Sequence, residues 1–285
     1  MLLQRIITAL LLLIAFVAVT VLLSAFQFSI LLALIVVVAA WEWAGFVGLK
    51  SASDKLPYIA TLASMELGII FLLGINSAAD YIDEFRASMV LILGALFWIL
   101  SLFMLTGFPD NKDKWNEESK IALMGIFALL PTWVGLLILK YMDSTGHYLL
   151  ALVILVAAVD VGAYFVGVNF GKKKLAPNLS PNKSWEGVWG GLALCMVVGA
   201  AFIWGLHRFV EPLSVVQVAL LMSLMVLVCF FSVVGDLVES MFKRNQGIKD
   251  SGAILPGHGG ILDRIDGLMA ATPVFVLTLM LVFRL

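Results

Sequence analysis

Charged residues are scarce in this 285-residue chain, because Asp, Glu, Lys and Arg together make up only 13% of it. A typical soluble domain contains roughly 25%. So few charges cannot cover the surface of a water-soluble protein of this length, which excludes a soluble fold. The net charge of −1 gives no reason to expect a nucleic acid as partner.

Cysteine and histidine are scarce as well, with two and three residues. Cys195 and Cys229 each stand alone in an apolar run, without a CxxC pair or a histidine at ligand spacing. This pattern excludes a sequence-local zinc site or redox pair. We interpret both cysteines as packing residues.

Apolar runs of membrane-spanning length, by contrast, recur along the whole chain, which is 62% hydrophobic. At roughly 20 apolar residues per span, the sequence predicts an all-α, polytopic bundle of about nine transmembrane helices. These are expected at residues 6–25, 29–47, 57–76, 87–107, 120–140, 148–168, 187–206, 213–235 and 267–284. The first run is longer than a signal-peptide core of ~7 to 15 residues, so we interpret it as a span.

Basic residues fall mainly on one side of these predicted spans, which receives 14 of the 18 Lys and Arg residues. By the positive-inside rule this side is the cytoplasm, so we expect a cytoplasmic N-terminus and a C-terminus outside. No repeat or linker divides the chain. We therefore expect one membrane domain, residues 1–285, with N-terminal spans in 1–147, catalytic spans in 148–285, and cytoplasmic loops at 171–186 and 236–267.

The second of these loops begins with a polar pattern of helical period. Asp236, Glu239, Ser240 and Lys243 would share one face if the eighth span continued through them. A stripe of carboxylates would then leave the membrane beside a cation.

The same loop ends in a glycine run and two further acids. Gly259 and Gly260, with Gly257, would let backbone amides approach phosphate oxygens closely. Asp263 and Asp266, three residues apart at the start of the last helix, would project together and could hold Mg²⁺, which prefers oxygen ligands.

Acids also occur within the predicted spans, where an ionisable group is costly without a partner. Asp160 lies inside the sixth span, and we interpret it as functional. Lys183 and Ser184 precede a helix start, so they could converge on an anion with the amides of that helix. The roles of Glu42 and Glu66 stay open. So does the basic cluster at 172–174, which fixes topology whether or not it contacts a substrate.

The run SMFKRNQGIKDSGAILPGHGGILDRID, residues 240–266, resembles the signature of the phosphatidate cytidylyltransferase family. The stretch 160–187 resembles a second block of that family, so the resemblance covers the C-terminal half. It implies transfer of CMP from CTP to phosphatidate, giving CDP-diacylglycerol and pyrophosphate, with Mg²⁺ as cofactor. A second, monovalent cation stays open. The resemblance also implies a bacterial inner-membrane protein whose partners are CTP, phosphatidate and the bilayer, with a homodimer left open.

Roles follow for residues of both blocks. We expect catalytic roles for Asp236, Asp263, Asp266, Lys243, Arg244 and His258. We expect substrate binding by Lys183, Ser184, Ser240, Lys249, Gly259, Gly260, Arg264, Asp160 and Tyr164. We expect metal coordination by Asp236, Asp263, Asp266 and Glu239.

Three alternatives are weighed against this interpretation. A transporter for a phosphorylated solute would also place charges within a helix bundle, but no internal repeat is evident. A CDP-alcohol phosphotransferase would need an arginine and two later aspartates that are missing after Ala270. A polyprenol or dolichol kinase would release CDP rather than pyrophosphate.

Overall fold

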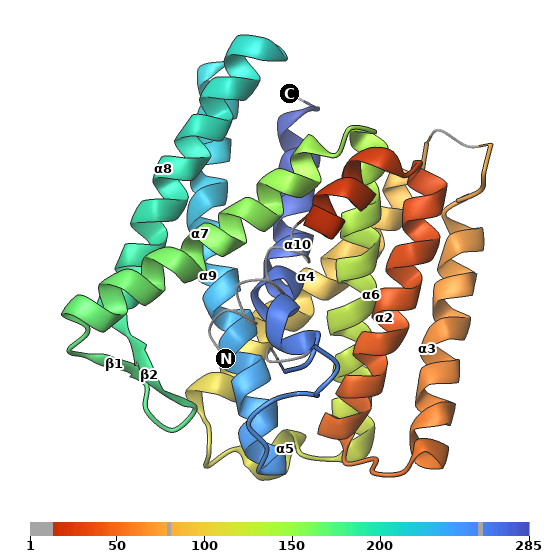
Figure 1. The fold of residues 1–285 in the computed structure, drawn as a ribbon, viewed down its shortest axis with the longest axis vertical. Helices are drawn as coiled ribbons and strands as arrows, with labels where there is room; N and C mark the ends of the chain where they lie inside the picture. The colour runs from red at the N-terminus through yellow and green to blue at the C-terminus, as the bar shows by residue number, and fades with distance from the viewer. Residues whose placement is uncertain (1–13, 79–80, 256–258, 285) are drawn as a thin grey trace.

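The structure is a computed structural model that describes residues 14–78, 81–255 and 259–284 (Figure 1). Its described elements are almost all helical. In chain order they are α2 (Ala25–Val47), α3 (Ala52–Leu72), α4 (Glu84–Thr106), the short α5 (Lys112–Trp115), α6 (Glu118–Met142), α7 (His147–Phe170), β1 (Lys174–Ala176), β2 (Ser180–Ser184), α8 (Trp185–Phe209), α9 (Val215–Gln246) and α10 (Leu262–Val282).

Within these described residues, eight helices are long and apolar enough to cross a membrane, and they correspond in order to the second to ninth predicted spans. This confirms an all-α membrane bundle. The first predicted span, 6–25, lies partly outside the described residues, although residues 14–22 are helical. That segment is held by the buried Lys140 of α6, whose ammonium donates to the Thr20 carbonyl oxygen at 2.5 Å.

Both segments that the sequence places in loops are partly regular. Residues 171–186 contain the antiparallel hairpin β1–β2, and α9 continues to Gln246 before Gly247 ends it with a φ of 67°. Because α10 already begins at Leu262, only residues 247–261 of the expected loop 236–267 lie between helices. The two segments are therefore shorter and more constrained than the sequence suggested.

Helix α6 occupies the centre of the bundle, and it packs against α2, α4 and α10 (Figure 1). Every residue from Ala128 to Lys140 is buried. The other main pairs are α7 with α8 and α9 with α10, so the C-terminal helices form a connected layer beside the N-terminal ones. Helix α3 is the most peripheral span, with only Leu62 and Glu66 buried.

Glycines bring α7 and α8 into close contact, and the GxxxG spacing of Gly187 and Gly191 is typical of such helix packing. A Cβ atom on Gly191 would lie 2.7 Å from the carbonyl oxygen of Val159. A Cβ atom on Gly162 would lie 2.5 Å from the carbonyl oxygen of Gly190. Because the obstructing atoms belong to the backbone, the helices would have to separate to accept a side chain at either position.

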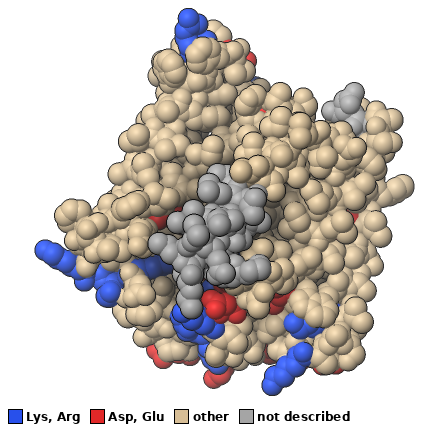
Figure 2. All heavy atoms as spheres, in the orientation of Figure 1, with Lys and Arg blue, Asp and Glu red and all other residues tan. Residues whose placement is uncertain are grey.

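Charged side chains gather at one end of the bundle (Figure 2). In this view Lys and Arg cluster along the lower edge, where α5 and the β1–β2 hairpin lie in Figure 1. Most of the upper part of this face is uncharged. The two ends of the bundle therefore differ in charge, and the hairpin lies at the charged end.

The glycine contact leads to a first prediction. Replacing Gly191 with Ala should destabilise the protein by about 1 to 3 kcal/mol, because the methyl group overpacks a backbone contact. Gly205→Ala in the same helix is the matched control, since a Cβ there meets nothing within 4 Å. Thermal unfolding in detergent should show a lower apparent melting temperature for Gly191→Ala only. Equal behaviour of the two variants would contradict the close contact.

Candidate functional site

A buried ion-pair network lies where α9 meets α10. The ammonium of Lys243 is 2.6 Å from Glu239 Oε2 and 2.7 Å from Asp263 Oδ1. The side chains of Lys243, Glu239 and Asp263 are 13%, 2% and 7% exposed. Helix α9 places Glu239 and Lys243 one turn apart, as the sequence predicted, and α10 supplies the second acid.

The other oxygen of Asp263 holds the loop before α10. Asp263 Oδ2 accepts hydrogen bonds from the Ser251 amide at 2.9 Å, the Ser251 hydroxyl at 3.0 Å and the Gly260 amide at 2.9 Å. Gly259, next to it, has a φ of 84°, which disfavours other residues. One amide of the glycine run, that of Gly260, thus binds a carboxylate of the chain itself, and the approach of these amides to phosphate oxygens stays a prediction.

Glu42 also reaches this loop, a contact that the sequence did not reveal. Its carboxylate accepts hydrogen bonds from the Ile261 amide at 3.0 Å, the Leu262 amide at 2.9 Å and the Ser251 hydroxyl at 3.2 Å. The residue is 2% exposed. Helix α2 therefore contributes a buried acid to a segment of the C-terminal half.

A second charged group lies between α7, the hairpin, α9 and α10. Lys183 of β2 forms an ion pair with Asp236 of α9. Ser240, one turn after Asp236, donates to Asp236 Oδ1 at a long 3.4 Å. The Asp266 carboxylate interacts electrostatically with Asp236, Lys183 and Asp160. Three acids from three helices thus surround one lysine.

This group borders a cavity of about 770 Å³. Asp160, Lys183 and Asp236 line its polar part, and apolar residues of α7, α8 and α9 line much of the rest. Tyr164 and Ser184 also line it, so two further predicted substrate-binding residues lie there. A cavity with a charged part and an apolar part suits an amphipathic ligand that carries a phosphate.

Other predicted residues have different surroundings. Arg244 donates to the Leu179 carbonyl oxygen at 3.2 Å and so ties the hairpin to α9. The Ser184 hydroxyl accepts a hydrogen bond from the Gly187 amide at 3.2 Å and caps α8. Lys249 and Arg264 are exposed, and Arg264 interacts electrostatically with Asp160. His258 lies outside the described residues.

Carboxylate oxygens are suitable ligands for a hard cation such as Mg²⁺, but the described acids do not form a ready coordination site. Among the described residues, no group of three or more His, Cys, Asp or Glu side chains is placed to hold a metal ion. Glu239 Oε1, however, is buried and has no hydrogen-bond partner. Such an atom is costly in an apolar setting, and it is an oxygen donor close to Asp266, with which Glu239 interacts electrostatically.

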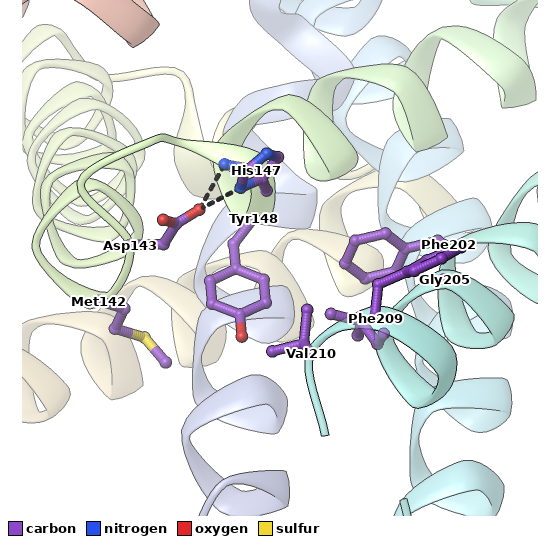
Figure 3. Close-up of a pocket in the computed structure, with 9 residues that line it drawn as sticks. Met142, Asp143, His147, Tyr148, Phe202, Gly205, Phe209 and Val210 are labelled. Carbon is purple, nitrogen blue, oxygen red and sulfur yellow. Dashed lines mark hydrogen bonds and ion pairs between the residues drawn. The ribbon is translucent and has the colours of Figure 1, made fainter. Parts of the chain in front are cut away.

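A further hollow, of about 610 Å³, lies at the opposite ends of α6, α7 and α8 (Figure 3). The rings of Tyr148, Phe202 and Phe209 surround it, and Asp143 contacts His147 at its edge (Figure 3). Burial raises the pKa of the Asp143 carboxyl, but hydrogen bonds from Thr145 and His147 outweigh it and lower that pKa overall. No Lys or Arg lines this hollow among the described residues, so it is the weaker candidate for binding phosphate.

The fold and the site define a polytopic membrane protein with a charged cavity at one end of its C-terminal helices. The sequence profile of the cytidylyltransferase family matches residues 3–282, and the chain belongs to this family. It is thus a membrane-embedded nucleotidyltransferase.

Similar proteins occur in several bacteria, and two of them match nearly the whole chain. A Pseudomonas aeruginosa protein named phosphatidate cytidylyltransferase is 42% identical over 277 residues, which cover 96% of each chain. A Haemophilus influenzae protein of the same name is 38% identical, covering 96% of this chain and 97% of that one. A Bacillus subtilis protein of that name is 37% identical over 63% of this chain and 64% of its own.

The buried network leads to a second prediction. Lys243→Met should destabilise the protein by about 3 to 5 kcal/mol, because Glu239 and Asp263 would lose their counter-charge while staying buried. Lys120→Met is the control, since its pair with Glu117 is exposed and such pairs contribute about 0 to 1 kcal/mol. The apparent melting temperature in detergent measures both. A small, equal change in the two variants would contradict the network.

Proposed function

We propose that the chain transfers the cytidylyl group from CTP to phosphatidate, giving CDP-diacylglycerol and pyrophosphate, with Mg²⁺ as the cofactor. The observation that carries the proposal is the cavity in which Lys183, Asp236 and Asp160 face an apolar wall. A phospholipid substrate needs charged groups for its phosphate and an apolar surface for its chains. The names of the bacterial relatives agree with the proposed reaction.

The proposed reaction is an in-line displacement at the α-phosphorus of CTP. A phosphatidate oxygen forms the new P–O bond while the bond to pyrophosphate breaks. Because the attacking oxygen is already anionic, no general base is required, and the residues of the site act by positioning and charge compensation. Lys183 lines the cavity and would bind the lipid phosphate, and Arg264 interacts electrostatically with Asp160, another residue of the cavity lining.

Asp236, Asp266 and Glu239 would hold Mg²⁺, with Asp160 near them. The bound ion would screen the repulsion between the two anionic substrates. Lys183 forms an ion pair with Asp236 in the structure, so coordination of Mg²⁺ by Asp236 would leave this lysine available to bind phosphate. Asp263 has a different part, because both its oxygens already accept hydrogen bonds or ion pairs.

We further propose that the site faces the cytoplasm of a bacterial inner membrane. Lys and Arg gather at the end of the bundle that carries the site (Figure 2), which agrees with the positive-inside rule. CTP is soluble and phosphatidate stays in the leaflet, so a site at the helix ends meets both.

A transfer assay tests the reaction. The purified chain should move label from CTP carrying a labelled α-phosphate into the lipid phase when phosphatidate and Mg²⁺ are present, with one pyrophosphate released per lipid product. Release of CDP instead would identify a lipid kinase. Solute flux in liposomes without any lipid product would favour a transporter.

A substitution tests the metal assignment. Asp266→Asn should lower transfer by about 100-fold or more, because the amide keeps the shape of the carboxyl but loses the charge that a divalent cation requires. Binding of Mn²⁺, followed by its paramagnetic resonance signal, should weaken in parallel. Asp143→Asn, at the other end of the bundle, is the control. Near wild-type transfer by Asp266→Asn at saturating Mg²⁺ would refute the assignment.

A further inference from the structure

Glu42 lies in the apolar helix α2. The described groups that contact its carboxylate are all hydrogen-bond donors from the loop before α10 and from the first residues of that helix. Ile261 and Leu262 donate from the backbone, and Ser251 lies within hydrogen-bond distance through its hydroxyl. Its described contacts include no ion pair with Lys, Arg or His. Burying a carboxylate without a cation is costly, so its hydrogen bonds must compensate for the lost hydration.

These contacts supply the N-terminal cap that α10 lacks. The first amides of a helix have no partner within it, and the N-cap residue Ile261 has no polar side chain to provide one. Glu42, which belongs to α2, accepts hydrogen bonds from two of these amides. Its negative charge is also favourable at the positive end of the α10 dipole. Helix α2 therefore caps α10 across a separation of about 220 residues.

The cap is linked directly to the ion pair of the site. The Ser251 hydroxyl lies 3.2 Å from Glu42 Oε2 and 3.0 Å from Asp263 Oδ2, so its one hydrogen serves both carboxylates. There is also no room for a side chain around Glu42, since Cβ atoms on Gly252 or Gly260 would collide with its carboxyl group. The loop thus fits the acid closely on both sides.

We propose that Glu42 is a positioning residue for the nucleotidyl transfer. It holds Ser251 and the start of α10 at Ile261 and Leu262, and thereby places Asp263 against Lys243 and Asp266 one turn further along the helix. This role rests on the proposed function, and it gives the N-terminal spans a part in the chemistry although none of their described residues lines the cavity.

The geometry requires a carboxylate rather than an amide. All three neighbours donate hydrogen bonds, and a carboxylate can accept every one of them. In Glu42→Gln, the amide nitrogen would face a donor, and one buried N–H would lose its acceptor. The variant keeps the shape of the side chain, so it tests the hydrogen bonds and not the packing.

Glu66→Gln is a matched control. Glu66 is 3% exposed in α3, a similar burial in another N-terminal span, and its Oε1 has no hydrogen-bond partner. It contacts neither the loop nor the cavity among the described residues. The same chemical change therefore has no route to the site.

The experiment measures transfer and hydrogen exchange on both purified variants. Glu42→Gln should lower kcat by about tenfold to 100-fold, as loss of a supporting hydrogen bond does at other sites. The KM for phosphatidate should change less than twofold, because the described lining of the cavity comes from α7, α8, the hairpin and α9 and includes no described residue of the loop. Glu66→Gln should match the wild type in both constants.

Hydrogen–deuterium exchange provides a readout that does not depend on the reaction. Peptides covering residues 259–264 should exchange faster in Glu42→Gln, while those from α4 and α6 should not. Exchange that rises throughout the bundle, or an unchanged kcat beside local opening, would overturn the positioning role. If the wild type transfers no cytidylyl group yet the local opening occurs, the proposed function fails and the cap survives.

Discussion

The site depends on the stabilisation of charged side chains that are buried between the helices. An unpaired ion in an apolar interior costs several kcal/mol, so each acid must meet a cation or a set of donors. Lys243 meets this requirement for Glu239 and Asp263, and Lys183 does so for Asp236. Because the pairs join α9 to α10 and to the hairpin, the same interactions that neutralise the acids also fix the elements around the cavity.

Close helix packing determines where these charges can meet. The glycines of α7 and α8 bring two backbones into contact and so set the cavity wall that carries Asp160. At Gly235 a Cβ would collide with the backbone of Asp266, which brings α9 and α10 equally close. Glycines therefore set the distances between these helices, and these distances allow the charged side chains of different helices to meet.

The sequence predicted those parts of the structure that follow from local periodicity. Hydrophobic runs indicated the spans, and the offsets of Asp236, Glu239 and Lys243 indicated their shared face, because both patterns lie within one helix. The hairpin was missed because β1 and β2 are only three and five residues long and β2 contains Pro181, so no strand alternation is visible. Glu42 could not be assigned because its partners include two backbone amides, 219 and 220 residues away, which have no signature in the side-chain sequence.

The length of α9 bears on where the proposed site lies relative to the bilayer. Its 32 residues span about 48 Å, whereas the hydrocarbon core of a bilayer is about 30 Å thick. One uninterrupted rod therefore continues from the lipid tails into the headgroup layer, and Asp236, Glu239 and Lys243 lie along its last part. In the proposed mechanism these residues act in the layer where a lipid phosphate resides and a water-soluble nucleotide arrives without entering the hydrocarbon.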